Sequence, residues 1–172
     1  MNKCVKFLIV LAVCISWLPV SAQFRTVKIG NQVWMAENMN KDVPGSYVFN
    51  GKAEFEKKYG RLYTYEAAKK VCPLGWHLPS DSDWDELFNT VGGEDIAAKG
   101  LKINGNSGFK ALAGGYANGS SFWFIEVYGG FWSSTSYDTN HAWYVFFTNK
   151  DDAITKTYFS KNYGFSVRCL KN

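Results

Sequence analysis

The chain has 172 residues and a formal net charge of +4. This length suits one ordinary domain with a single hydrophobic core. So weak a basic excess, without a cluster of Lys and Arg, argues against a nucleic-acid-binding protein. Phe, Trp and Tyr make up 17% of the residues, which indicates either a dense aromatic core or a surface that stacks on a ligand.

Residues 1–22 have the pattern of a cleavable export signal. Lys3 and Lys6 are followed by the apolar residues 7–20 and by small residues at the cleavage point. The apolar run is shorter than the ~20 residues that cross a bilayer, so no membrane span is expected. We predict a soluble mature chain, residues 23–172, that is exported to the periplasm, the cell surface or the medium.

The cysteine content changes when the export signal is removed. Cys4 and Cys14 leave with the signal, whereas Cys72 and Cys169 remain in a compartment where a disulfide persists. A bridge between them would close a long loop and stabilise the fold by roughly 4–5 kcal/mol. Two alternatives stay open. The two cysteines are free buried thiols, or the chain is a lipoprotein attached through Cys14, which the valine before Cys14 disfavours.

The first elements of the mature chain are short strands. Two alternating stretches surround Gly30-Asn31 within residues 25–38 and predict a tight β-hairpin. Weaker strand candidates follow at residues 45–49 and 60–63. The charged stretch 52–58 between them has no helical periodicity, so no helix is predicted there.

Helical periodicity begins at Thr64, which can cap a helix that runs through Cys72. The spacing of the apolar residues places the Cys72 sulfur on the buried face of this helix. After a break, Ser80 is a good N-cap for a second helix with an apolar stripe. That stripe consists of Trp84, Leu87, Phe88 and Val91. The pattern at residues 94–99 predicts a third, short helical turn.

From residue 101 onward the pattern becomes β-structure interrupted by glycine. The predicted strands are residues 122–126, 131–134, 142–148, 153–159 and 164–170. The predicted turns are Gly114-Gly115, Asn118-Gly119 and Gly129-Gly130.

Alternation in the last predicted strand places Cys169 on the same face as Phe165 and Val167. Ser166 and Arg168 share the other face. Because Cys169 then points into the core, a disulfide from the first helix to the last strand is geometrically reasonable.

Several motifs resemble known domains. YTYEAAKKVCPLGWHLPSDSDWDELF resembles the two-helix region of C-type lectin-like domains. More closely, IGNQVWMAENMN, most of that segment, GFKALAGGYANGSSF, GFWSSTSY and YGFSVRC together resemble the Fibrobacter succinogenes major paralogous domain, a family found on exported bacterial proteins. The resemblance covers nearly all of residues 26–172. It implies an α+β, C-type lectin-like fold in which two helices of the N-terminal half pack on twisted antiparallel sheets with long loops, and in which Cys72 pairs with Cys169.

Calcium-dependent sugar binding does not follow from this resemblance, because its motifs are missing. The chain contains no Glu-Pro-Asn or Gln-Pro-Asp loop and no Trp-Asn-Asp strand. Oxygen donors at Asp138, Asn140, Asp151 and Asp152 would suit calcium, but a solvated loop is the preferred interpretation. We predict no metal site and no cofactor.

Catalytic motifs are also weak in this chain. The related formylglycine-generating enzymes use a pair of cysteines near the C-terminus, where this chain has only Cys169. His77 and His141 are the only histidines, and His77 is interpreted as structural. The carboxylates that could resemble a glycosidase pair are Asp81, Asp83 and Asp85. Helix capping explains them more simply, so the chain is not expected to be an enzyme.

The remaining candidate is a binding face at residues 115–150, where ligands usually meet the C-type lectin-like fold. Aromatic rings beside Asn, Asp and Ser suit the recognition of sugars and of protein surfaces. The candidate ligand-binding residues are Tyr116, Asn118, Trp123, Tyr137, Asp138, Asn140, His141 and Trp143. The four between residues 137 and 141 are expected to be exposed, whereas burial of Trp123 and Trp143 stays open.

The chain is thus predicted to be a secreted, non-enzymatic binding module. The leading hypothesis is an adhesin-like protein that recognises an extracellular glycan or a cell-surface protein. The alternative is a structural subunit of a bacterial envelope or fimbria-like assembly. The oligomeric state is left open.

Overall fold

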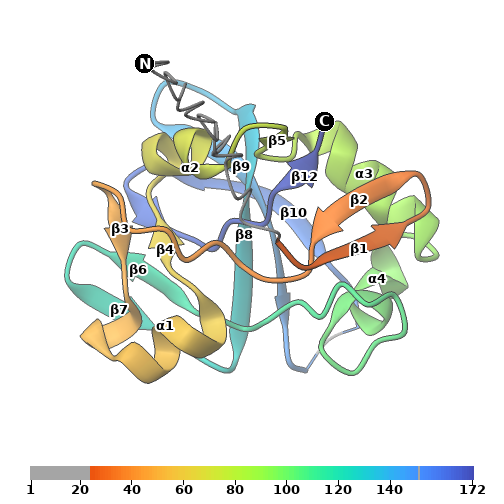
Figure 1. The fold of residues 1–172 in the computed structure, drawn as a ribbon, viewed down its shortest axis with the longest axis horizontal. Helices are drawn as coiled ribbons and strands as arrows, with labels where there is room; N and C mark the ends of the chain where they lie inside the picture. Colours follow the sequence, from red (N-terminus) through yellow and green to blue (C-terminus); the bar gives the residue numbers. More distant parts are fainter. Residues whose placement is uncertain (1–23, 151) are drawn as a thin grey trace, which may run out of the picture.

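The computed structural model describes residues 24–150 and 152–172. The predicted export signal, the lipidation alternative at Cys14 and the calcium-donor candidate Asp151 lie outside the described residues. The fold is mixed α/β, with α-helices packed around several open antiparallel sheets (Figure 1). In the part of the chain that the structure describes, none of the helices is long and apolar enough to span a bilayer.

The predicted hairpin is confirmed. β1 (Thr26–Ile29) pairs antiparallel with β2 (Gln32–Met35), and Gly30 turns the chain with a φ of 58°. β2 also pairs with β12 (Leu170–Lys171), which pairs in turn with β5 (Trp76–His77). This four-stranded sheet therefore joins the first and last elements of the described chain.

The three predicted helices are also confirmed. They are α2 (Tyr65–Val71), α3 (Asp81–Thr90) and α4 (Glu94–Leu101). The Thr64 side chain accepts a hydrogen bond in the first turn of α2, and Ser80 forms a capping box at the start of α3. These side chains satisfy backbone N–H groups that an uncapped helix leaves unpaired.

An additional helix corrects the expectation that the charged stretch after residue 51 is not helical. It is α1 (Ala53–Tyr59), which follows the single turn η1 (Phe49–Gly51). Within α1 only Tyr59 is buried, so the sequence shows no apolar stripe. The weaker strand candidates on either side are confirmed, because β3 (Ser46–Tyr47) pairs with β4 (Leu62–Tyr63).

The C-terminal half contains two three-stranded sheets. The first consists of β8 (Tyr128–Ser136), β9 (His141–Thr148) and β10 (Thr155–Ser160), with β9 in the middle. The second consists of β6 (Tyr116–Asn118), β7 (Ser121–Trp123) and β11 (Tyr163–Gly164), with β6 in the middle. The predicted strands at 131–134, 142–148 and 153–159 fall largely within the first sheet, whereas β6 was not predicted.

Gly129-Gly130 is part of a strand, and the prediction of a turn there is wrong. A Cβ atom on Gly129 would lie 2.4 Å from the ring of Phe147, and one on Gly130 would lie 2.7 Å from the ring of Phe165. Both glycines therefore allow aromatic rings to pack directly against the backbone of β8.

The predicted strand at 122–126 ends at Trp123. Phe124 and Glu126 have left-handed backbone conformations, with φ values of 58° and 65°. This region of backbone space is uncommon for residues other than glycine. The chain therefore leaves β7 in an irregular loop before β8 begins.

The predicted strand at 164–170 is also wrong as a continuous element. Only its two ends join ladders, as β11 and β12, while the residues between make single bridges, such as Phe131 with Ser166. This segment is buried on both sides, because Ser166, Val167 and Arg168 are all 0% exposed. Side chains that alternate along this segment therefore point into the protein interior on both sides, and neither side faces solvent.

The β8–β9–β10 sheet separates two hydrophobic cores. Phe131 of β8 belongs to the core that contains Trp84 of α3, whereas the next residue, Trp132, belongs to the core that contains Tyr65 of α2. Successive side chains of a strand point to opposite faces of its sheet. Helices α2 and α3 therefore cover opposite faces of the same sheet.

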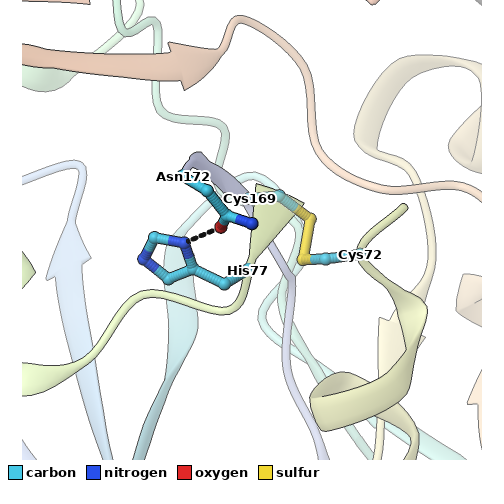
Figure 2. The surroundings of a disulfide bond; sticks show 4 residues. All are labelled: Cys72, His77, Cys169 and Asn172. Carbon is cyan, nitrogen blue, oxygen red and sulfur yellow. Dashed lines mark hydrogen bonds between the residues drawn. A yellow bond between two sulfur atoms is a disulfide. The ribbon is translucent and has the colours of Figure 1, made fainter. Parts of the chain in front are cut away.

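The predicted disulfide joins the end of α2 to the segment before β12. Cys72 and Cys169 have Cα atoms 5.9 Å apart and are separated by 97 positions in the sequence. Figure 2 shows that His77 lies beside this bridge, where its Nδ1 donates a hydrogen bond to Oδ1 of Asn172 at 2.7 Å. The bridge and this contact fasten the last residues to the segment between α2 and α3.

Candidate functional site

The eight candidate ligand-binding residues fall into two groups on opposite sides of the β8–β9–β10 sheet. We call Tyr137, Asp138, Asn140, His141 and Trp143, together with Tyr158 of β10, the hairpin-tip cluster. We call Tyr116, Asn118 and Trp123, together with Phe124, the Trp123 cluster. The structure therefore does not bring the candidate residues of 115–150 together on one surface.

Aromatic rings of the hairpin-tip cluster form a compact arrangement at the surface. The rings of Tyr137 and Tyr158 are parallel, with centroids 3.8 Å apart, and are 48% and 43% exposed. Trp143 meets both rings edge-on at 5.4 and 5.9 Å and is half-buried. The pairing of β9 with β10 places Tyr158 directly opposite Trp143. The neighbouring Tyr158 raises the pKa of Tyr137.

Asp138 organises the turn that carries this cluster. Its Oδ1 accepts hydrogen bonds from the backbone N–H groups of Asn140 and His141, both at 2.7 Å. The ring Nδ1 of His141 lies 2.9 Å from both carboxylate oxygens. The hydrogen bond from His141 lowers the pKa of Asp138. Asp138 is thus occupied inside the turn, while Asn140 remains exposed.

Lys161 holds the hairpin tip in place from outside the predicted set. Its ammonium group donates to Ser136 Oγ at 2.8 Å and to the carbonyl oxygens of Asp138 and Thr139 at 2.6 and 3.1 Å. Three contacts from one side chain fix the backbone beside Tyr137. No sequence signal links Lys161 to this turn, because it lies beyond β10.

The Trp123 cluster is a second group of rings. Tyr116 is half-buried against Tyr128 and Phe165, and Trp123 packs on it with a centroid distance of 5.4 Å. Phe124 is 56% exposed on the loop that follows β7. Trp123 is also exposed, which resolves the question of its burial, and Asn118 lies at the exposed end of β6.

The described carboxylates considered for calcium, Asp138 and Asp152, do not gather into a metal site. Among the described residues, no group of three or more His, Cys, Asp and Glu side chains is close enough to hold a metal ion. Asp138 is already engaged by its own turn, and Asp152 lines a different cavity.

The three acidic residues at the start of α3 take separate positions. Asp83 accepts from the backbone N–H of Ser80 at 2.7 Å, and Asp85 forms an ion pair with Lys156. Asp81 is partly buried, which raises its pKa, and its Oδ1 accepts no hydrogen bond from a described residue. Capping and ion pairing thus occupy two of these carboxylates.

One cavity lies away from the residues chosen from the sequence. It measures about 600 Å³ and is lined by parts of α1, the end of α4, the segment 111–113 and Glu126. Tyr59 and Lys58 of α1 donate hydrogen bonds to Glu126 Oε1 at 2.7 and 2.9 Å. These contacts lower the pKa of Glu126, and Tyr59 and Glu126 raise that of Lys58 to about 12.

Arg168 is a buried cation that sequence reasoning missed. Its Nε and Nη2 donate to Asn38 Oδ1 at 3.2 and 2.7 Å, and its Nη1 donates to the carbonyl oxygen of Phe109. The guanidinium carbon lies 4.4 Å from the centroid of the Phe109 ring. Complete burial lowers the pKa of Arg168 to about 9, so the group remains charged at neutral pH. The only signal in the sequence was its place in an alternating segment.

Comparison with known proteins gives one match. The family model of the Fibrobacter succinogenes major domain matches residues 27–171. No curated protein and no solved structure matches the chain. The matched range includes every helix and strand described above except the first residue of β1. The chain therefore belongs to the Fibrobacter succinogenes major domain family.

Proposed function

We propose that this protein is an exported, non-enzymatic binding module with a C-type lectin-like fold. Its role is adhesin-like, the recognition of a glycan or a cell-surface protein through the hairpin-tip cluster. Residues 1–22 supply the export signal, and the protein acts in the periplasm, at the cell surface or outside the cell.

Two features support export and the proposed fold. A disulfide between Cys72 and Cys169 is compatible with an oxidising compartment. The same bridge joins the helix α2 to the last strand segment, which is where the C-type lectin-like pattern has one. Long irregular segments between α4 and β8 also agree with that fold.

The hairpin-tip cluster is the observation that carries the proposed function. Tyr137 and Tyr158 present exposed rings whose geometry is set before a ligand arrives. The apolar face of a sugar, or an apolar side chain of a protein, can pack on such rings. Asn140 beside them offers an amide for hydrogen bonds to hydroxyl or peptide groups. Rigid aromatic anchors beside polar groups are typical of binding surfaces.

A glycan array and a protein pull-down, each with and without calcium, test this proposal. We expect Tyr137→Ala combined with His141→Ala to abolish the binding detected for the intact protein. The control is Phe124→Ala, which removes an exposed ring of the Trp123 cluster and should leave binding unchanged. If the double variant binds as well as the unaltered protein, the hairpin-tip cluster is not the binding site.

A second candidate function is supported by the other group of rings. Trp123, Phe124 and Val127 are exposed together, at 37%, 56% and 43%, and β7 is an edge strand of its sheet. Exposed apolar groups beside the free edge of a sheet suit a contact between subunits. As a subunit of an envelope or fimbria-like assembly, the protein would co-purify in a stoichiometric complex without added ligand, and Phe124→Ala would weaken that complex.

A further inference from the structure

Two neighbouring cavities form a groove along α1. The first, of about 600 Å³, lies between α1 and the end of α4. The second, of about 380 Å³, lies between α1 and the segment that follows β2. Because Lys58, Ile103 and Leu112 line both cavities, the two are adjacent, and together they make an elongated depression. We call this depression the lysine groove.

Lysines from three distant parts of the chain line the groove. Lys57 comes from α1, Lys99 from α4 and Lys110 from the loop after residue 108. None of these three ammonium groups forms an ion pair with a described residue. The groove therefore offers positive charges that are available to a ligand.

The carboxylates that line the groove are mostly neutralised by other cations. Glu37 pairs with Arg25, Glu56 with Arg61 and Glu126 with Lys58. Asp152 also lines the groove, at its far end, and forms no ion pair with a described residue. Three unpaired lysines against this one carboxylate leave an excess of positive charge in the described lining.

A buried cation adds to the excess of positive charge near the groove. Arg168 forms no ion pair with a described carboxylate, and its hydrogen bonds go to Asn38 and to the carbonyl oxygens of Phe109 and Lys110. Asn38 and Lys110 both line the groove. Lys110 itself has a left-handed backbone with a φ of 52°. Arg168 thus holds the loop that presents Lys110 and adds a positive charge, without a direct ion pair to a described carboxylate, next to residues that line the groove.

We propose that the lysine groove binds an anionic polysaccharide, a chain of sugars that carries carboxylate or sulfate groups. An elongated groove with separated lysines suits a polymer with anionic groups at intervals better than a compact anion. Asn40 and Asn104 also line it and can bind sugar hydroxyls through their amides. Ile103, which is 54% exposed, and the half-buried Leu112 give apolar surface for the C–H face of a sugar ring. This site does not depend on the hairpin-tip cluster, which lies elsewhere.

Binding of defined polymers to the intact protein tests this inference. The probes are polygalacturonate for carboxylate, dextran sulfate for sulfate, neutral dextran and poly-glutamate. We expect tight binding of at least one anionic polysaccharide, weakened by added salt because salt screens exposed charges, and no binding of dextran. Preference for polygalacturonate or for dextran sulfate identifies the anionic group.

The variant that tests the groove is Lys57→Gln with Lys99→Gln and Lys110→Gln. We expect it to lose at least about tenfold in affinity. The matched control is Lys28→Gln with Lys70→Gln and Lys150→Gln, which changes the net charge equally on exposed lysines outside the groove. The control should retain its affinity within about twofold.

Three outcomes would overturn the inference. They are no binding of either anionic polysaccharide, an equal loss in the groove and control variants, and equally tight binding of poly-glutamate, which would indicate an acidic protein as the partner. The combined change of Tyr137→Ala and His141→Ala should leave this binding intact. Failure of the groove and failure of the hairpin-tip cluster can therefore be told apart.

Discussion

At the scale of single residues, Arg168 shows how one side chain can hold two distant segments together. It joins Asn38, which follows β2, to the backbone at Phe109 and Lys110. The sequence placed Arg168 on the strand face opposite Cys169 but did not indicate that it is buried. Alternation along a strand normally separates an inner face from a solvent-exposed one. Here both faces of the segment are interior.

We expect Arg168→Ala to lower the free energy of unfolding by about 3–5 kcal/mol, since it leaves buried carbonyl and amide oxygens without donors. Urea denaturation followed by circular dichroism measures this change. Arg25→Ala is the control, because Arg25 and its partner Glu37 are mostly exposed and such a pair contributes about 1 kcal/mol or less. A similar small effect for both variants would mean that the Arg168 contacts do not stabilise the fold.

Asp138 gives a pH-dependent prediction for the hairpin tip. Its pKa is lowered in the folded state, so the turn gains stability above the unfolded pKa of about 4 and loses it as pH falls through the folded value. We expect the amide hydrogens of Asn140 and His141 to be protected from exchange near neutral pH and to lose protection in acid.

The variant Asp138→Asn is the control for that experiment. It keeps an oxygen that can accept from both amides but has no carboxyl group to titrate. Protection should then be weaker at neutral pH and should not change further in acid. If the unaltered protein shows the same flat profile, the Asp138 carboxylate does not hold the turn.

At the scale of elements, local signals predicted some helices and strands better than others. α2 and α3 were predictable because each has a capping residue and a buried stripe within its own sequence. α1 has only one buried residue, so its helical conformation depends on neighbours such as Glu126 that contact it from far along the chain. Gly129-Gly130 looked like a turn because the rings that need those glycines lie in β9 and beyond β11.

The bridge between α2 and the segment before β12 gives a stability prediction at this scale. Closing a loop of 97 positions restricts the unfolded chain, so removing the bridge should lower the free energy of unfolding by roughly 2–5 kcal/mol. Urea denaturation of the protein with and without reductant measures this loss. The double variant Cys72→Ser with Cys169→Ser should match the reduced protein and show no response to reductant. A response in the double variant would assign the effect to something other than the bridge.

At the scale of the whole molecule, the two cores share one sheet and should unfold together. Phe131 and Trp132 are neighbours in β8 but belong to different cores. We expect Phe131→Ala and Trp132→Ala each to cost about 3–5 kcal/mol. In both variants, circular dichroism and tryptophan fluorescence should report one common transition. Two separate transitions would show that the cores are independent.

The proposed binding surfaces also depend on the whole molecule, which limits what the sequence could reveal. Tyr137 and Asp138 are adjacent in the chain, so their exposure could be inferred from a polar stretch between two strands, whereas the half-burial of Trp143 could not. Tyr158 comes from a different strand, and Lys57, Lys99 and Lys110 come from three separate elements. Such groups meet only after the chain has folded, and no local sequence pattern predicts that they lie close together.

The disulfide has a mechanical consequence when the described chain is pulled from its two ends. Tension applied between residues 24 and 172 would pass directly from Cys72 to Cys169, bypassing the 97 positions of chain between them. Tyr137, Trp143 and Tyr158 all belong to that bypassed segment. Stretching could therefore lengthen only the residues before Cys72 and after Cys169, while the strands that carry these rings bear no load along their own backbone.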